Sequence, residues 1–259
     1  MKKIILSAIV FVGAMTLNAQ DEAPKLSISG TVDAYYQTYL TASDDVSGSF
    51  GTSFADEAGF ALGMANLVLS YDGEKTGVVA DLVYGPRGDS AAGGYNLNQL
   101  YAYWDVNDNL TLTMGNFNTF LGYEVISPAA NFNYSTSYMF SYGPFSHTGM
   151  KLDFSVSDDV SIMLGVFNQT DQTEANYDRY TAFGAQLGLY GQYINLLAGE
   201  DYTQIDFTGG FDLSDSFFLG INATSASLAG DTGFAGVALY PQLTASDSFA
   251  IGLRGEFFS

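Results

Sequence analysis

Few residue types in this chain can support covalent or metal chemistry. The sequence of 259 residues has no cysteine and a single histidine, His147. A serine activated by this histidine and an acid is the hydrolytic arrangement that the composition still allows. However, His147 stands where a long irregular segment ends and an alternating strand pattern begins, which favours a structural position at a water interface. We therefore predict no catalytic residue, and we exclude thiolate sites and sites with several histidine ligands.

Adjacent acidic residues are the next candidates, because carboxylate oxygens are the ligands that calcium prefers. Such pairs occur at 44–45, 56–57, 158–159 and 200–201. None of them lies in a loop with calcium-ligand spacing, and adjacent acids are typical of solvated turns. The sequence predicts no metal site and no cofactor.

Aromatic residues are the third candidate group, since the chain has 18 tyrosines and 20 phenylalanines. Aromatic rings can stack on sugars. Aromatic girdles at the two interfaces of a membrane β-barrel explain most of these residues without any ligand. We expect only a few of them, between Phe120 and Phe145, to line a path.

Two alternating segments must hold the region in which those aromatics lie. Residues 109–117 (NLTLTMGNF) alternate apolar and polar side chains, and Met150, Leu152, Phe154 and Val156 begin a second alternation. Residues 119–146 between them are rich in aromatics and have no sustained period, and so long a connection usually has a function. We predict that this segment folds into or over the mouth of a β-barrel and narrows it, with these residues in the constriction: Phe120, Tyr123, Glu124, Tyr134 and Tyr138.

The same alternation recurs along the chain and gives about thirteen strands of about ten residues, near the length that a tilted strand needs to cross a membrane. Long connections alternate with short turns such as Asp72-Gly73. This rhythm predicts an all-β, antiparallel transmembrane barrel over residues 20–259, with long outer loops and short periplasmic turns. A soluble β-sandwich is the rival architecture, but it would bury its apolar residues and rarely needs so long an aromatic loop.

Composition and charge agree with a membrane-exposed surface. Charged residues make up 14% of the chain, against roughly a quarter in soluble domains. The formal charge is −20, so nucleic acid is excluded as a partner, because phosphate binding needs clustered lysine and arginine. Acidic outer loops explain this charge, and an acidic lumen that prefers cations is the alternative.

The first 19 residues have the parts of a secretory signal peptide. Lys2 and Lys3 precede an apolar run from Ile4 to about Met15, and Ala19 supplies a small residue at the cleavage site. A membrane anchor is the alternative, but the apolar run is shorter than the ~20 residues of a spanning helix.

Several short strings resemble the OmpL-like outer-membrane β-barrel porins of Gram-negative bacteria. They are GYEVISP at 122–128, NFNYS at 131–135, SYGPFSHTG at 141–149, GTVDAYY at 30–36, LSYDGEK at 69–75, GPR at 85–87 and FDLSDSF at 211–217. The resemblance implies an outer-membrane location, contact with outer-membrane lipid and lipopolysaccharide, and passive diffusion of small polar solutes. It leaves an oligomer open. A non-conducting barrel with a structural or adhesive role is the alternative function, and an enzyme is not predicted.

Charged and polar residues that alternate with apolar neighbours are expected to face the lumen. A basic side chain turned toward lipid near the bilayer midplane would cost roughly 2–4 kcal/mol, which favours this orientation. The expected pore-lining residues are Asp33, Gln37, Lys151, Asp153, Asp206, Arg254 and Glu256.

An odd number of strands predicts that the barrel needs further strands after residue 259, because single-chain bacterial barrels have an even number. The string GLRGEF at 252–257 also resembles an interior stretch of the porins named above. Merging the two strands near Glu200 would instead give an even count of about twelve.

Overall fold

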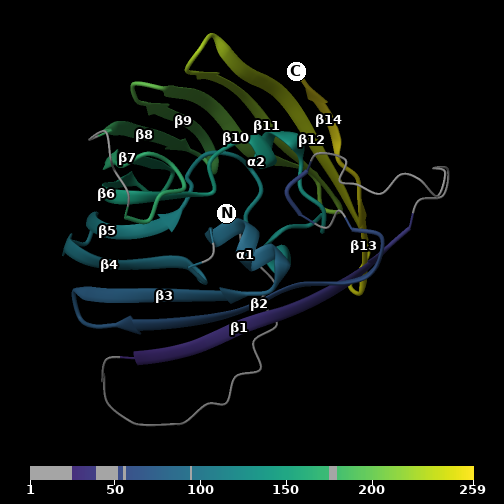
Figure 1. Ribbon diagram of the computed structural model, residues 1–259, viewed down its shortest axis with the longest axis horizontal. Coiled ribbons are helices and arrows are strands. Elements are labelled where there is room, and N and C mark those ends of the chain that lie inside the picture. The colour runs from purple at the N-terminus through teal and green to yellow at the C-terminus, as the bar shows by residue number, and fades with distance from the viewer. Residues whose placement is uncertain (1–24, 39–51, 55–56, 94, 175–179) are drawn as a thin grey trace.

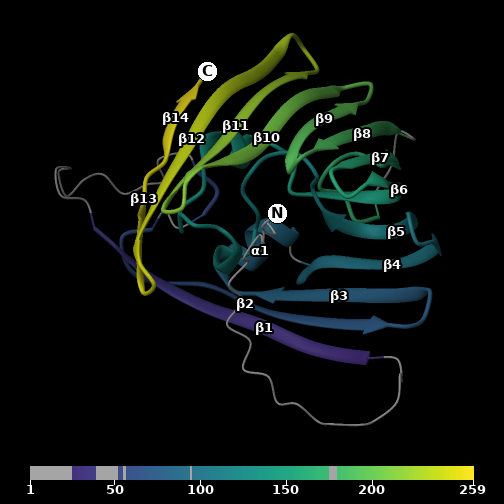
Figure 2. The same cartoon turned by 180° about the vertical axis from the view of Figure 1, so that it is seen from behind.

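The computed structural model describes residues 25–38, 52–54, 57–93, 95–174 and 180–259. The predicted signal peptide, the acidic pair at 44–45 and Asp56 lie outside the described residues. The described chain forms one antiparallel sheet that curls around an interior containing helices and loops (Figure 1; Figure 2 shows it from behind).

Each strand pairs with its neighbours in the sequence, which confirms the predicted all-β antiparallel class. The strands are β1 (Lys25–Gln37), β2 (Gly59–Asp72), β3 (Thr76–Tyr84), β4 (Leu97–Asn107), β5 (Leu110–Asn118), β6 (Ser146–Ser157), β7 (Val160–Phe167), β8 (Ala182–Leu189), β9 (Gln192–Ala198), β10 (Tyr202–Ser214), β11 (Phe217–Leu228), β12 (Thr232–Ser246), β13 (Phe249–Gly252) and β14 (Gly255–Phe258).

The last two strands occupy one position in the sheet, because β13 and β14 both pair with β12. The sheet is therefore thirteen strands wide, as the sequence predicts. The predicted continuous strand from Phe249 to Phe258 is interrupted at 253–254. Pro241 lies on β12 opposite Leu253. Its oxygen accepts the N–H of Leu253 at 3.0 Å, but it has no N–H to donate in return, so the regular pairing is interrupted there.

The two strands near Glu200 are separate, with Thr203 on β10 paired to Ala198 on β9. Among the described residues, β1 pairs with β2 alone, and β13 and β14 pair with β12 alone, so the sheet is open between β1 and its last strands. The expectation of further strands stays a prediction.

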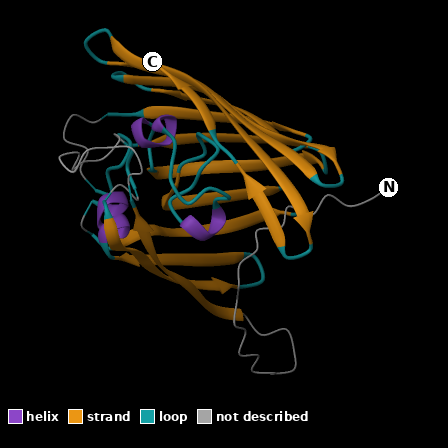
Figure 3. Ribbon diagram, turned by 90° about the vertical axis from the view of Figure 1, so that its right-hand side faces the viewer, coloured by secondary structure: helices purple, strands orange, loops and turns teal. Residues whose placement is uncertain are grey.

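Short turns lie at one end of the sheet, as between β4 and β5, and the longest connections lie at the other end. The latter carry α1 (Pro86–Ala92), η1 (Pro128–Ala130) and α2 (Tyr138–Tyr142), which lie within the curve of the sheet in Figure 3. The connections at 199–201 and 229–231 are short although they lie at the long-loop end. No helix among the described residues is long and apolar enough to cross a membrane.

The two faces of the sheet differ in the way that the alternation predicts. Large apolar side chains are exposed on the outer face; Val32, for example, is 83% exposed. On the inner face Asp81 and Asp206 are 4% and 1% exposed. This distribution is the reverse of that in a soluble protein, and it suits a sheet whose outer surface meets lipid.

Candidate functional site

Residues 119–145, which we call the inner loop, cross the interior of the curved sheet. The backbone N–H of Gly122 donates to Oδ1 of Asp206 on β10 at 2.9 Å. The ring of Tyr123 stacks on Tyr240 of β12, with 4.3 Å between centroids. At the far side, the hydroxyl of Tyr134 donates to Asp33 on β1. The inner loop is therefore held by strands from widely separated parts of the sheet.

A buried ion pair joins the inner loop to the break between β13 and β14. Nη1 of Arg254 lies 2.9 Å from Oε1 of Glu124, and the two side chains are 17% and 3% exposed. The guanidinium also donates to the backbone oxygen of Thr136 at 2.8 Å and to Ser135. The other carboxylate oxygen of Glu124 accepts the N–H of Ser137 at 2.9 Å. These contacts satisfy both charged groups within the interior.

The next acid along the chain holds the short helix of the inner loop. The carboxylate of Glu256 on β14 accepts the backbone N–H groups of Tyr138 and Met139 at 2.9 and 2.8 Å. These N–H groups lie in the first turn of α2, where they have no partner within the helix. The Ser137 hydroxyl caps the same helix by accepting the N–H of Phe140 at 3.1 Å.

Asp206 lies at the centre of a polar network on the inner wall. Its two carboxylate oxygens accept Nδ2 of Asn195 on β9 at 2.9 Å and Nδ2 of Asn222 on β11 at 2.6 Å. Gln186 on β8 extends the network by donating to Asn195 at 2.8 Å. Together with Gly122, these donors satisfy a carboxylate that is otherwise costly to bury.

A matching network centres on Asp81 on the opposite part of the wall. Asn66 on β2 and Asn98 on β4 donate to its two carboxylate oxygens at 2.9 and 2.6 Å. Thr31 on β1 donates to Asn66 at 2.7 Å. Two buried aspartates, each between asparagines on the neighbouring strands, thus tie the inner wall together, and the sequence analysis identified only Asp206.

Arg87 in α1 is a second buried cation that the sequence analysis missed. It is 4% exposed, its Nε donates to the backbone oxygen of Ile126 at 2.7 Å, and its guanidinium carbon lies 4.5 Å from the centroid of the Phe54 ring. Burial lowers the pKa of Arg87, while Asp33, Tyr134 and Glu124 oppose that shift. Arg87 therefore fixes the inner loop to α1. The only sequence feature that contains it is the string GPR at 85–87.

His147 takes a structural position at the start of β6, as predicted, but it is fully buried and does not face water. Its Nε2 lies 2.9 Å from Oγ1 of Thr119, and its ring packs against Phe120 and Phe167 at 5.1 Å each. The inner loop turns inward at Thr119 and covers the ring, which a strand pattern alone does not reveal.

The seven predicted pore-lining residues lie on the face opposite the exposed apolar side chains, but their surroundings differ. Asp33, Arg254 and Glu256 bind the inner loop, and Asp206 is buried beneath it. Lys151 and Asp153 form an ion pair of 2.8 Å and are 25% and 41% exposed. Gln37 lies four residues after Asp33 on β1, on the same inner face. Their role as pore-lining residues stays a prediction.

The five predicted constriction residues all lie in the inner loop. Glu124, Tyr123 and Tyr134 make the contacts described above. Phe120 packs on His147, and its backbone oxygen accepts Nε2 of Gln186 at 3.4 Å. Tyr138 stacks on Phe258 of β14, with 5.6 Å between centroids. That these residues narrow a passage stays a prediction.

A recess of about 340 Å³ lies on the inner wall and is bounded by strand residues alone. We call it the wall recess. Its lining residues come from β4, β5 and β6: Gln99, Tyr101, Tyr103, Asp105, Thr111, Thr113, Phe117, Asn118 and Lys151. The inner loop contributes no side chain to its lining, so this part of the wall stays accessible.

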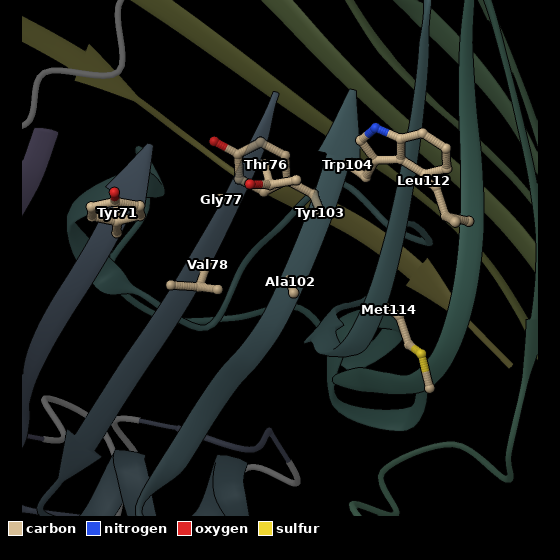
Figure 4. A pocket seen from close by; sticks show the side chains of 9 residues that line it. All are labelled: Tyr71, Thr76, Gly77, Val78, Ala102, Tyr103, Trp104, Leu112 and Met114. Atoms are coloured by element: carbon tan, nitrogen blue, oxygen red, sulfur yellow. The ribbon is translucent and has the colours of Figure 1, made fainter. Parts of the chain in front are cut away.

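A second groove, of about 400 Å³, lies among residues that include the outward side chains of β2 to β5 (Figure 4). Val78, Trp104 and Met114 in its lining are 50%, 48% and 68% exposed. Such a groove suits the apolar chains of lipid, and we assign no polar-solute site to it.

Comparison with known proteins agrees with the geometry of the sheet. No curated protein matches the chain. The family model described as "Putative beta-barrel porin-2, OmpL-like" matches residues 25–259. This match includes every described strand and the whole inner loop. The chain therefore belongs to the OmpL-like β-barrel porin-2 family.

Proposed function

We propose that the protein is an outer-membrane porin of a Gram-negative bacterium, through which small polar solutes diffuse passively. The observation that carries this proposal is the polar wall recess beside the inner loop. A solute that moves along β4 and β5 meets hydroxyl, amide and charged groups there, while the apolar outer face suits lipid. Passive diffusion along this wall needs no catalytic group, so we propose no enzymatic activity.

The inner loop supports the view that the passage is narrow and of fixed shape. Its ends are held by β5 and β6, and its middle by Asp33, Asp206, Arg254 and Glu256. A loop with contacts on several strands cannot move aside without losing several buried hydrogen bonds. Solutes are therefore expected to pass beside the loop, along the wall that it leaves uncovered.

The same contacts favour a second candidate, a non-conducting barrel with a structural or adhesive role. In that case the inner loop closes the interior as a plug, and the wall recess does not connect the two sides of the membrane. The two candidates differ in one measurable property, which is ion current through a single molecule.

Recording from the purified protein in planar lipid bilayers tests the proposal. A porin gives discrete, uniform current steps, and liposomes that contain it swell in isosmotic solutions of small solutes. A parallel sample that is unfolded before reconstitution controls for detergent leakage. The absence of both steps and swelling, with correctly folded protein in the membrane, would reject the channel and favour the plugged barrel.

A further inference from the structure

The wall recess combines aromatic rings with polar groups in a regular arrangement. Gln99, Tyr101, Tyr103 and Asp105 occupy alternate positions of β4, so their side chains share the inner face. The intervening Leu100 and Trp104 are 50% and 48% exposed on the outer face. One strand therefore presents two aromatic rings between an amide and a carboxylate.

The rings of the recess are held in place by their neighbours. Tyr101 packs edge-on against Phe117 of β5, with 6.4 Å between centroids and 82° between planes. The Tyr103 ring lies over Gly77 on β3 so closely that a Cβ at that position would overlap it. The hydroxyl of Tyr103 donates to Asp72. The aromatic surface is thus preorganised, which reduces the entropy cost of binding.

The polar groups offer both donors and acceptors. Oε1 of Gln99 accepts the backbone N–H of Asn118 at 3.1 Å, which directs its amide nitrogen elsewhere. Oδ1 of Asn118 is buried and has no hydrogen-bond partner among the described residues. Nζ of Lys151 lies 5.5 Å from the Phe117 ring centroid and can donate further bonds besides the one to Asp153.

We propose that the wall recess binds a small neutral polyhydroxylated solute, such as a mono- or disaccharide, on its way through the barrel. This inference rests on the proposed function and names its solute class. The apolar face of a sugar ring packs on Tyr101 and Tyr103, and its hydroxyls use the mixed donors and acceptors around them. The volume of about 340 Å³ falls within the range of small-molecule sites, about 300–1,000 Å³.

The charges of the recess disfavour the other two classes of solute. A cation at Asp105 would also approach the ammonium group of Lys151, whose charge is offset only in part by its pairing with Asp153. An anion would meet Asp105, whose carboxylate accepts only one hydrogen bond within the described chain, from Thr111 at 2.7 Å. A neutral hydroxylated molecule can donate to Asp105 and accept from Lys151, so it matches both groups without bringing a net charge.

Binding can be measured without any current. Maltose and glucose are titrated by calorimetry into the full-length protein in detergent micelles, with choline and glucuronate as cationic and anionic probes. We expect saturable binding of a neutral sugar, with a Kd in about the millimolar range. Tyr103→Ala should weaken it by about tenfold, through loss of ring contact. Trp104→Phe, on the same strand but the outer face, should leave it unchanged.

A second variant, together with a folding assay, distinguishes loss of sugar binding from misfolding. Asp105→Ala removes a hydrogen-bond acceptor beside a turn and should also weaken sugar binding several-fold. Heat-dependent gel mobility confirms that each variant is folded. Absence of saturable sugar binding, tighter binding of choline or glucuronate, or equal binding by all variants would overturn the inference. Conductance without sugar binding would reject this inference alone, whereas sugar binding without conductance would reject the channel alone.

Discussion

Arg254 and Glu124 are 130 residues apart in the sequence, and their side chains meet at 2.9 Å within the curve of the sheet. The arginine comes from the break between β13 and β14, and the glutamate comes from the inner loop. The break that Pro241 introduces into the ladder therefore coincides with the attachment point of the loop. The last strands of the sheet and the proposed constriction depend on each other for stability.

Removal of one partner of this pair should destabilise the protein strongly. Glu124→Gln leaves a largely buried guanidinium without its counter-charge, which typically costs about 3–5 kcal/mol. The measurement is the unfolding midpoint in detergent, followed by heat-dependent gel mobility. The matched control is Asp153→Asn, because the Lys151–Asp153 pair, at 2.8 Å, is similar in length to the 2.9 Å pair but is more exposed and should lose at most about 1 kcal/mol. Equal losses in the two variants would contradict the assigned role of the Glu124–Arg254 pair.

Asp206 should be essential for stability, not for charge in the passage. Asp206→Ala leaves the N–H of Gly122 and Nδ2 of Asn195 without their acceptor, whereas Nδ2 of Asn222 keeps its bond to the backbone oxygen of Phe207. We expect a loss of at least about 2 kcal/mol, since each buried unsatisfied group costs about 1–3 kcal/mol. Asp212→Ala on the same strand is the control, because Asp212 is exposed. A denaturant titration of both variants measures the difference. If the Asp206→Ala variant were as stable as the Asp212→Ala control, the polar network around Asp206 would not contribute to the stability of the protein.

The contact between Tyr134 and Asp33 should make the folded protein less stable at alkaline pH. Burial, together with the hydrogen bond to Asp33, raises the pKa of Tyr134 above its ordinary value. The folded state therefore retains a proton that the unfolded state releases at about pH 10. This stabilisation is complete below about pH 10 and is lost as the pH rises above it.

Comparison of unfolding midpoints from pH 8 upward tests this point. Wild-type protein should lose stability above about pH 10 more steeply than Tyr134→Phe, which has no proton to release. Tyr84→Phe, an outer-face tyrosine that is 51% exposed, is the control and should follow the wild type. Parallel curves for wild type and Tyr134→Phe would show that this hydroxyl does not couple to folding.

Open channels should prefer cations. Lys151 and Arg254 are each paired with an acid within 3 Å, whereas Asp105 faces the interior without a basic ion-pair partner among the described residues. A low-dielectric wall focuses the remaining negative field. Reversal potentials in a KCl gradient measure the preference, which should weaken at high salt because of screening. A reversal potential of the opposite sign would contradict this prediction.

The fold was predictable from the sequence because its determinants are local. Alternation along Lys25–Gln37 and Leu110–Asn118 sets the two faces of each strand, and residues such as Asp72-Gly73 set the turns. The break at 253–254 escaped prediction because its cause, Pro241, lies on the neighbouring strand. The alternation of residues along one strand cannot reveal the effect of a proline on the neighbouring strand.

The site was predictable only in part, because it depends on contacts between distant segments. Length and composition indicated the inner loop, and alternation gave the inward faces of Asp206 and Arg254. The burial of His147 and Arg87 depends on where the loop folds, which no local pattern records. The wall recess lies along the inner face of β4, where Tyr101 and Tyr103 alternate with outward residues and share a face with Gln99 and Asp105. It was missed because most aromatic residues of the chain were attributed to membrane girdles.

Single-channel recording of a loop-deleted variant beside the wild type tests the central claim most directly. Asn118 and Ser146 are partners in the β5–β6 ladder, so a short Gly-Ser turn in place of residues 120–144 can still join these two strands. If the inner loop narrows an open passage, the wild type gives small uniform steps and the variant gives steps at least roughly twofold larger, as expected when a loop is removed from a channel lumen. Equal steps in both proteins, or silence in both, would contradict the account.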